Sequence, residues 1–153
     1  MDDNIQLFIE KTNTLLEQKK FAELNNEITT EILLKFQNPV LYYFKCIARQ
    51  QENADLEEIV EYAKTGLELN QHHRGLLEFH YIYHMKLGLS DIALLSGSNL
   101  SEAFPDHHVY QFWLGEALQL TGAHTDASLA LSKGHRLLSL SYLEQGVMDK
   151  SLE

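Results

Sequence analysis

Residues 74–107 read RGLLEFHYIYHMKLGLSDIALLSGSNLSEAFPDH, and residues 108–141 read HVYQFWLGEALQLTGAHTDASLALSKGHRLLSLS, two consecutive blocks of 34 residues. When the two blocks are aligned, Gly88 falls on Gly122. Other residues that follow this frame are Ala93 and Ala127 and, one period earlier, Ala54, Ile59, Ala63 and Gly66. A period of this length indicates small helical units that bury their apolar faces only against neighbouring units. The repeat therefore predicts an all-α chain of stacked helix pairs.

Capping residues place the ends of the predicted helices. Asn38 before Pro39 is typical of a helix start, and Gly88 and Gly122 are typical of helix ends. Further predicted starts are Asp2 or Asp3, Asp55 with Glu58, Ser90, Asp106, Thr125, and Ser141 with Glu144. The predicted helices before residue 74 cover residues 5–16, 21–36, 40–51 and 55–70. Those after it cover residues 74–87, 90–104, 108–120, 125–138 and 142–152.

The unit that starts at His108 carries small and bulky apolar residues at a regular set of positions. Positions 7, 8, 11, 15, 20, 24 and 27 are Leu114, Gly115, Leu118, Gly122, Ala127, Leu131 and Gly134. In this pattern the unit resembles a tetratricopeptide repeat. The resemblance implies an antiparallel helix-pair solenoid, a tetratricopeptide-like superhelix with a C-terminal closing helix. We expect a single domain over residues 1–153, with a degenerate unit at 5–38, units at 40–73, 74–107 and 108–141, and a closing helix at 142–152.

Composition limits the classes of partner. The chain of 153 residues has 12 Lys or Arg against 22 Asp or Glu, a formal charge of −10. This charge repels phosphate backbones, so we expect no nucleic acid partner. No apolar run approaches the roughly 20 residues of a membrane span, so we expect a cytoplasmic protein without membrane insertion. The lone Cys46 cannot form an internal disulfide, and we expect it to be a buried thiol.

The resemblance also implies a concave groove lined by the first helix of each unit. The predicted groove residues are Leu41, Phe44, Phe79, Ile82, Met85, Val109, Phe112, Trp113, Glu116 and Gln119. An apolar and aromatic strip of this kind is typical of a surface that binds a peptide. Gln111 occupies a position that is apolar in the family. This departure predicts either a slightly rotated helix or a Trp113 side chain that faces a ligand.

Two kinds of ligand can be weighed from the same positions. The carboxylate clamp with which this family binds the tails of Hsp70 and Hsp90 requires basic residues where Val109 and Trp113 stand, so we expect no such tail. The small size, acidic charge and repeat number are similar to those of the chaperones of bacterial type III secretion. That similarity implies a chaperone for apolar segments.

Histidines are the remaining candidates for chemistry. His80 and His84 are spaced to place two imidazoles on one metal ion, but the Glu of the zinc-protease motif is missing. We expect packed imidazoles there. The pairs His72–His73 and His107–His108 are predicted at turns and helix starts. No phosphate-binding loop or catalytic triad pattern is present, so the sequence predicts neither an enzyme nor a cofactor.

These patterns predict a non-catalytic adaptor or chaperone that binds an apolar or amphipathic peptide with basic flanks. Two alternatives stay open. The first is a homodimeric assembly module, whose interface is formed either by the degenerate N-terminal helix pair or by the aromatic first helices with Tyr42, Tyr43 and Phe44. The second is a metal-binding protein or metalloenzyme that depends on its histidines.

Overall fold

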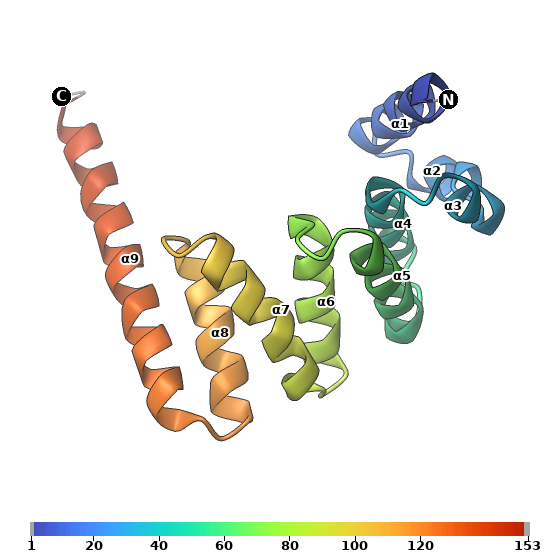
Figure 1. Ribbon diagram of the computed structural model, residues 1–153. Coiled ribbons are helices and arrows are strands. Elements are labelled where there is room, and N and C mark those ends of the chain that lie inside the picture. Colours follow the sequence, from blue (N-terminus) through green and yellow to red (C-terminus); the bar gives the residue numbers. More distant parts are fainter. Residues whose placement is uncertain (1, 152–153) are drawn as a thin grey trace. The chain divides into compact units, whose positions relative to one another are not determined.

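The computed structural model describes the backbone of residues 2–151 and the side chains of residues 4–146. Within this range every regular element is an α-helix, as predicted (Figure 1). The helices are α1 (Asp2–Glu17), α2 (Phe21–Glu27), α3 (Thr30–Phe36), α4 (Pro39–Gln51), α5 (Leu56–Leu69), α6 (Arg74–Lys86), α7 (Ser90–Ala103), α8 (His108–Leu120) and α9 (His124–Ser151). The chain divides into two compact units, Met1–Leu87 and Gly88–Glu153. This boundary falls inside the predicted repeat 74–107, and the single-domain organisation stays a prediction.

The first unit packs α1 to α6 around one core. Its fully buried side chains include Leu24, Ile28, Leu41, Ile59 and Leu76. Cys46 is also fully buried and its Sγ lies 3.7 Å from the carbonyl oxygen of Ile59, which confirms the predicted buried thiol. Burial in apolar surroundings raises the pKa of this thiol, which keeps it protonated and unreactive.

The second unit packs α8 against α7 and against the first half of α9. Small residues allow the close approach of α8 and α9. A Cβ atom at Gly115 would lie 2.6 Å from Leu131, and one at Gly134 would lie 2.8 Å from the ring of Phe112. Gly115 and Gly134 therefore serve the close packing of these two helices. Gly88 and Gly122 have φ angles of +76° and +91°, the left-handed conformation expected where a helix ends.

Several helix starts differ from the sequence-based prediction. Asn38 caps α4 as expected, because its Oδ1 accepts from the amide of Val40 at 2.9 Å. At α6 and α8 the caps are histidines: the Nδ1 atoms of His73 and His107 accept from backbone amides three residues later. The prediction of Asp106 as the cap of α8 was therefore wrong.

Three other predicted starts also need correction. Asp55 directly precedes α5, as predicted, but its side chain makes no capping hydrogen bond. The carboxylate of Glu58 pairs with Arg49, so the two residues do not form the predicted capping box. Ser90 is the first residue of α7 and not its cap, which is Leu89. Helix α9 begins at His124, one residue before the predicted cap Thr125.

The ends of the described chain differ from prediction in how the helices are divided. The predicted helix 21–36 is two short helices, because Thr29 interrupts it and its side chain accepts from the amide of Ile32. At the other end, the closing segment is helical but continues α9 without a break. The reason is that Ser139–Leu140–Ser141 contains no Gly or Pro to end the helix.

Candidate functional site

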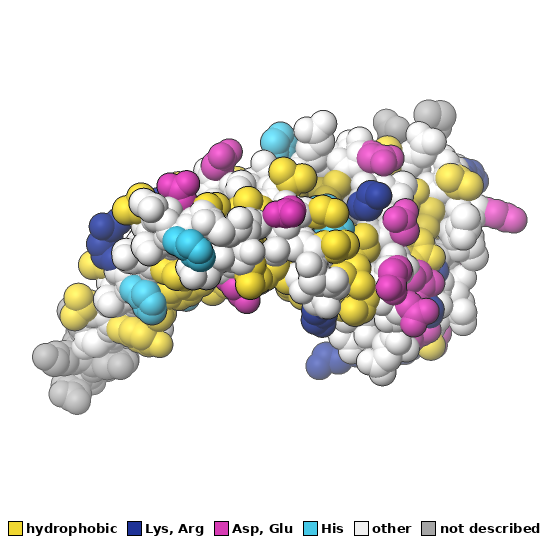
Figure 2. Space-filling view, turned by 90° about the horizontal axis from the view of Figure 1, so that it is seen from below, with side chains coloured by type: hydrophobic (Ala, Val, Ile, Leu, Met, Phe, Trp, Pro, Cys, Tyr) yellow, Lys and Arg dark blue, Asp and Glu magenta, His cyan; other side chains and the backbone are white. Residues whose placement is uncertain are grey.

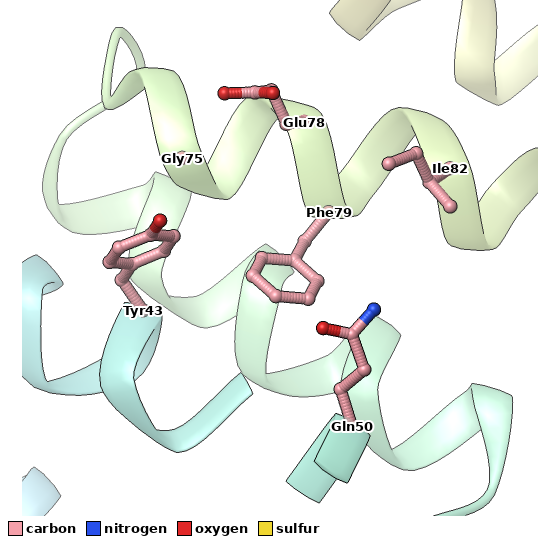
Figure 3. Close-up of a pocket in the computed structure, with 6 residues that line it drawn as sticks. All are labelled: Tyr43, Gln50, Gly75, Glu78, Phe79 and Ile82. Carbon is pink, nitrogen blue, oxygen red and sulfur yellow. The ribbon is translucent and has the colours of Figure 1, made fainter. Parts of the chain in front are cut away.

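A pocket opens between α4 and α6 in the first unit. Its lining residues are Tyr43 and Gln50 from α4, and Gly75, Glu78, Phe79 and Ile82 from α6 (Figure 3). Its volume is about 160 Å³. An apolar cavity of about 150 Å³ holds a benzene molecule, so this pocket can take one side chain of a partner. Five of the six lining residues are half-buried, so they offer surface at the mouth of the pocket.

Gly75 brings Tyr43 of α4 close to the backbone of α6. A Cβ atom at position 75 would lie 2.3 Å from Cε1 of Tyr43 and 2.7 Å from its Cδ1. A side chain at this position would therefore displace the ring. Gly75 thus permits the aromatic ring to lie flat against the first turn of α6 and to form one wall of the pocket.

Aromatic rings form one wall of the pocket, and a further ring packs against that wall from outside the pocket. The ring centroids of Tyr43 and Phe79 are 5.9 Å apart with an edge-to-face arrangement, and those of Phe79 and Tyr83 are 5.8 Å apart and stacked. Both separations lie in the range where aromatic pairs are favourable. The rings of the pocket are therefore fixed by one another before any ligand arrives, which favours a preformed site.

Polar groups lie on two edges of the pocket. Burial raises the pKa of the Tyr43 hydroxyl, and the nearby carboxylate of Glu78 raises it further, so this hydroxyl stays protonated at neutral pH. Gln50 forms a side-chain hydrogen bond with Tyr83, which partly offsets the rise that burial causes in the pKa of Tyr83. The pocket thus combines an apolar aromatic wall, a carboxylate and an amide.

The register of α4 explains which groove residues the sequence analysis missed. Helices α4, α6 and α8 begin at Pro39, Arg74 and His108, so the first spacing is 35 residues and the second is 34. Counting a constant 34 residues backward shifted the prediction by one position on α4. Tyr43 and Gln50 were therefore missed, although the Asn38–Pro39 helix start was the signal that could have found them.

The same shift placed core residues in the predicted groove. Leu41 has no exposed surface and Phe44 is only 6% exposed, so both fill the core of the first unit. Their assignment to an open groove was wrong. On α6, Phe79 and Ile82 line the pocket, whereas Met85 is half-buried and is not among its lining residues.

The candidates on α8 lie in the second unit and in different surroundings. Phe112 packs against Gly134 and against the ring of His135 at 4.9 Å, so α9 covers part of it. Val109 and Trp113 are half-buried, while Glu116 and Gln119 are exposed. The ring of Trp113 lies 5.5 Å from that of Tyr110.

Gln111 is buried on the same helix, where the family has an apolar residue. Its amide donates to the carbonyl oxygen of Pro105 at 3.2 Å, which satisfies the buried polar group. The unusual Gln is therefore explained by a hydrogen bond to the preceding loop.

The aromatic residues that the homodimer alternative places in its interface are mostly buried within a single copy of the chain. Tyr42 and Phe44 belong to the core of the first unit, and Tyr43 forms a wall of the pocket. Side chains that the monomer already buries cannot also form an interface between two copies. A homodimer that uses Tyr42 and Phe44 is therefore not supported.

His80 and His84 are packed side by side on α6, with ring centroids 4.1 Å apart. The Nδ1 of His84 lies 2.7 Å from the carbonyl oxygen of His80. Because a carbonyl only accepts, Nδ1 of His84 carries the proton. No group of three or more His, Cys, Asp or Glu side chains that could hold a metal ion occurs among the described residues. The metal-binding alternative stays a prediction.

The half-buried side chain of His80 predicts a loss of stability in acid. Burial, with further contributions from His84 and Lys64, lowers the pKa of His80 from 6.5 to about 4. Between these values the unfolded chain binds a proton that the folded chain does not bind, so stability falls as the pH drops from about 6.5 to 4. Since His80 is partly exposed, we expect a loss of about 1–2 kcal/mol.

Urea unfolding at pH 7 and at pH 4.5, with His80→Gln as the comparison, measures this contribution. The variant should lose less stability than the wild type over this interval. The pKa of His73 is also lowered by burial, and the comparison removes its contribution because both proteins retain it. An equal loss in the two proteins would show that His80 does not couple folding to pH.

Comparisons with known proteins bear on the fold. No protein-family model matches the chain, and no curated protein sequence matches it significantly. The crystal structure of MamA is similar with a TM-score of 0.74 and 11% identity, over 91% of this chain and 81% of that chain. MamA from Desulfovibrio magneticus RS-1 gives a TM-score of 0.72 and 18% identity, over 86% and 74% of the two chains.

A third similar structure is YrrB, described as a TPR protein with an unusual peptide-binding site. Its TM-score is 0.70 with 16% identity, over 93% of this chain and 73% of that chain. The chain has a tetratricopeptide-type fold. This similarity extends the tetratricopeptide resemblance from the strongly matching unit at residue 108 to most of the chain, including the degenerate N-terminal helices. None of the helices in the described part of the chain has both the length and the apolar character that a membrane span requires.

Proposed function

We propose that the protein is a non-catalytic adaptor that binds a peptide segment of another protein in the groove between α4 and α6. The observation that carries this proposal is the preformed pocket, in which Tyr43, Phe79 and Ile82 supply apolar surface and Gln50 and Glu78 supply polar edges. A few well-packed anchors in such a pocket provide most of the binding energy in typical peptide complexes.

Charge supports a peptide that carries basic residues next to its apolar anchors. Residues 1–87 contain 14 Asp or Glu and 9 Lys or Arg. Acidic side chains gather on part of the face shown in Figure 2, and Glu52, Asp55 and Glu57 in and after the turn between α4 and α5 are exposed. Gln50 precedes this turn by two residues. A basic segment would therefore be attracted toward that end of the groove.

Other parts of the proposal rest on the amino-acid sequence rather than on the pocket. A chaperone role for apolar segments agrees with the apolar pocket, and the lack of nucleic acid partners agrees with the acidic charge. A cytoplasmic location stays a prediction from the sequence. The fold alone does not select among binding partners, because one fold serves many functions. The pocket chemistry is therefore the part that an experiment should test first.

Selection of peptides from a random 12-residue phage library against the full chain tests the proposal. Affinities of the selected peptides would be measured by calorimetry for the wild type and for Ile82→Ser, which removes an apolar wall from the pocket. We expect the variant to bind about tenfold more weakly, the size expected when one apolar contact is lost. Binding that Ile82→Ser leaves unchanged would refute the α4–α6 groove, and so would a selection that enriches no peptide.

Leu34→Ser is the matched control. Leu34 lies on α3 in the same unit and is 63% exposed, outside the pocket. This substitution removes a similar amount of apolar side chain, so it reports any general effect on the unit. It should leave the affinity unchanged.

A further inference from the structure

We propose that the pocket between α4 and α6 takes an arginine side chain of the bound segment, with the guanidinium against the rings of Tyr43 and Phe79 and paired with the carboxylate of Glu78. This inference rests on the proposed function, because it names the chemistry that the same site selects. It follows from the size of the pocket, its ring geometry and its charge.

The size and the rings suit a planar cation. The volume of about 160 Å³ is that of one side chain, and the centroids of Tyr43 and Phe79 lie 5.9 Å apart in an edge-to-face arrangement. A cation within about 6 Å of a ring centroid is attracted by the electrons of the ring face. The guanidinium of arginine is flat and weakly hydrated, so it stacks on aromatic faces better than the ammonium of lysine.

Glu78 supplies the charge that the cation needs. It lies on α6 beside Phe79 and is half-buried, and its carboxylate acts on the hydroxyl of Tyr43. In the described part of the structure, no ion pair involves Glu78. A half-buried carboxylate next to an aromatic wall is unfavourable for an acidic ligand and favourable for a basic one. A purely apolar ligand side chain would leave this carboxylate desolvated without a partner.

Gln50 completes the set of acceptors on the opposite edge. Figure 3 shows its amide oxygen on the side of Phe79, whereas the side chain of Glu78 leaves α6 on the opposite side of that helix. The Gln50 side chain interacts with the hydroxyl of Tyr83 and lowers its pKa, so the amide lies close to that ring. An arginine side chain has five N–H donors on a planar group, so it can donate hydrogen bonds to two different acceptors at once. A lysine ammonium in the same pocket has all its N–H donors on one nitrogen atom.

Two-dimensional ¹⁵N–¹H spectra of the full chain, titrated with small side-chain analogues, test this inference. The probes are n-propylguanidinium for arginine, n-butylammonium for lysine and 1-butanol as an uncharged analogue. We expect n-propylguanidinium to shift the amide signals of Gly75, Glu78 and Ile82 with a dissociation constant about tenfold lower than that of 1-butanol. n-Butylammonium should lie between the two.

Glu78→Gln should remove the preference for the cation, whereas Glu61→Gln should retain it. Glu61 lies on α5 outside the pocket and is exposed, so the second variant makes the same charge change elsewhere. Equal affinities for n-propylguanidinium and 1-butanol in the wild type would overturn the inference, as would signals at these amides that no probe shifts. The peptide selection with Ile82→Ser decides the proposed function separately, because it requires no particular residue in the pocket.

Discussion

Replacing Phe79 with Ala is expected to lower the free energy of unfolding by about 3–5 kcal/mol, the usual effect of removing a buried phenyl group. Phe79 is 9% exposed and belongs to the core cluster of the first unit. Its ring contacts those of Tyr43 and Tyr83, so the substitution leaves a cavity and removes two aromatic contacts. Chemical unfolding followed by circular dichroism measures the change.

Leu34→Ala is the control for this prediction, because it deletes a similar apolar group from an exposed site and should change stability by less than about 0.5 kcal/mol. A loss below about 1 kcal/mol in Phe79→Ala would contradict the placement of this ring in the core. If the large loss is observed, Phe79→Ala cannot serve as a binding test, because weaker binding would then reflect unfolding. Ile82 and Glu78 are better probes of the pocket, since both are half-buried at its mouth.

The fold could be predicted from the sequence because residues with strong conformational preferences mark the ends of the repeated helices. Gly88 and Gly122 end helices in a conformation that other residues rarely adopt, and Asn38 with Pro39 starts one. Gly115 and Gly134 mark places where helices approach closely. These signals are local, so they remain visible without knowledge of the tertiary structure.

The candidate site was predicted only in part, because lining a groove depends on rotation about a helix axis. A difference of one residue between the spacings of 35 and 34 turns the face of α4 by about 100°. That rotation puts Tyr43 in the pocket and Phe44 in the core. Residue type could not separate the two, since both are aromatic and adjacent in the sequence.

The sequence also did not predict that α9 is one continuous helix. Ser141 and Glu144 have the spacing of a capping box, but the same residues are accepted inside a helix when nothing forces the chain to turn. A cap signal predicts where a helix can start, whereas a Gly or Pro is needed to end the preceding one. That ending signal is missing from residues 139–141.

Lys45 is a further position whose role depends on tertiary structure, and we expect Lys45→Met to lower the free energy of unfolding by about 2–4 kcal/mol. Its side chain is 7% exposed although it carries an amino group. The Nζ atom donates to Oδ1 of Asn25 and to the carbonyl oxygen of Ile28, each at 2.6 Å, and to the carbonyl oxygen of Asn25 at 3.1 Å. The cation therefore caps the C-terminal end of α2, where a positive charge is favourable.

Methionine keeps the length and apolar stem of the side chain but has no N–H donors, so these acceptors would lose their partner on burial. Hydrogen exchange should then accelerate first in the amides of α2, because Lys45 links that helix to α4. Lys64→Met is the control, since Lys64 lies on the surface of α5 with a side chain 52% exposed and should change stability little. A Lys45→Met protein as stable as the wild type would mean that burial of the amino group already costs as much as its three hydrogen bonds contribute.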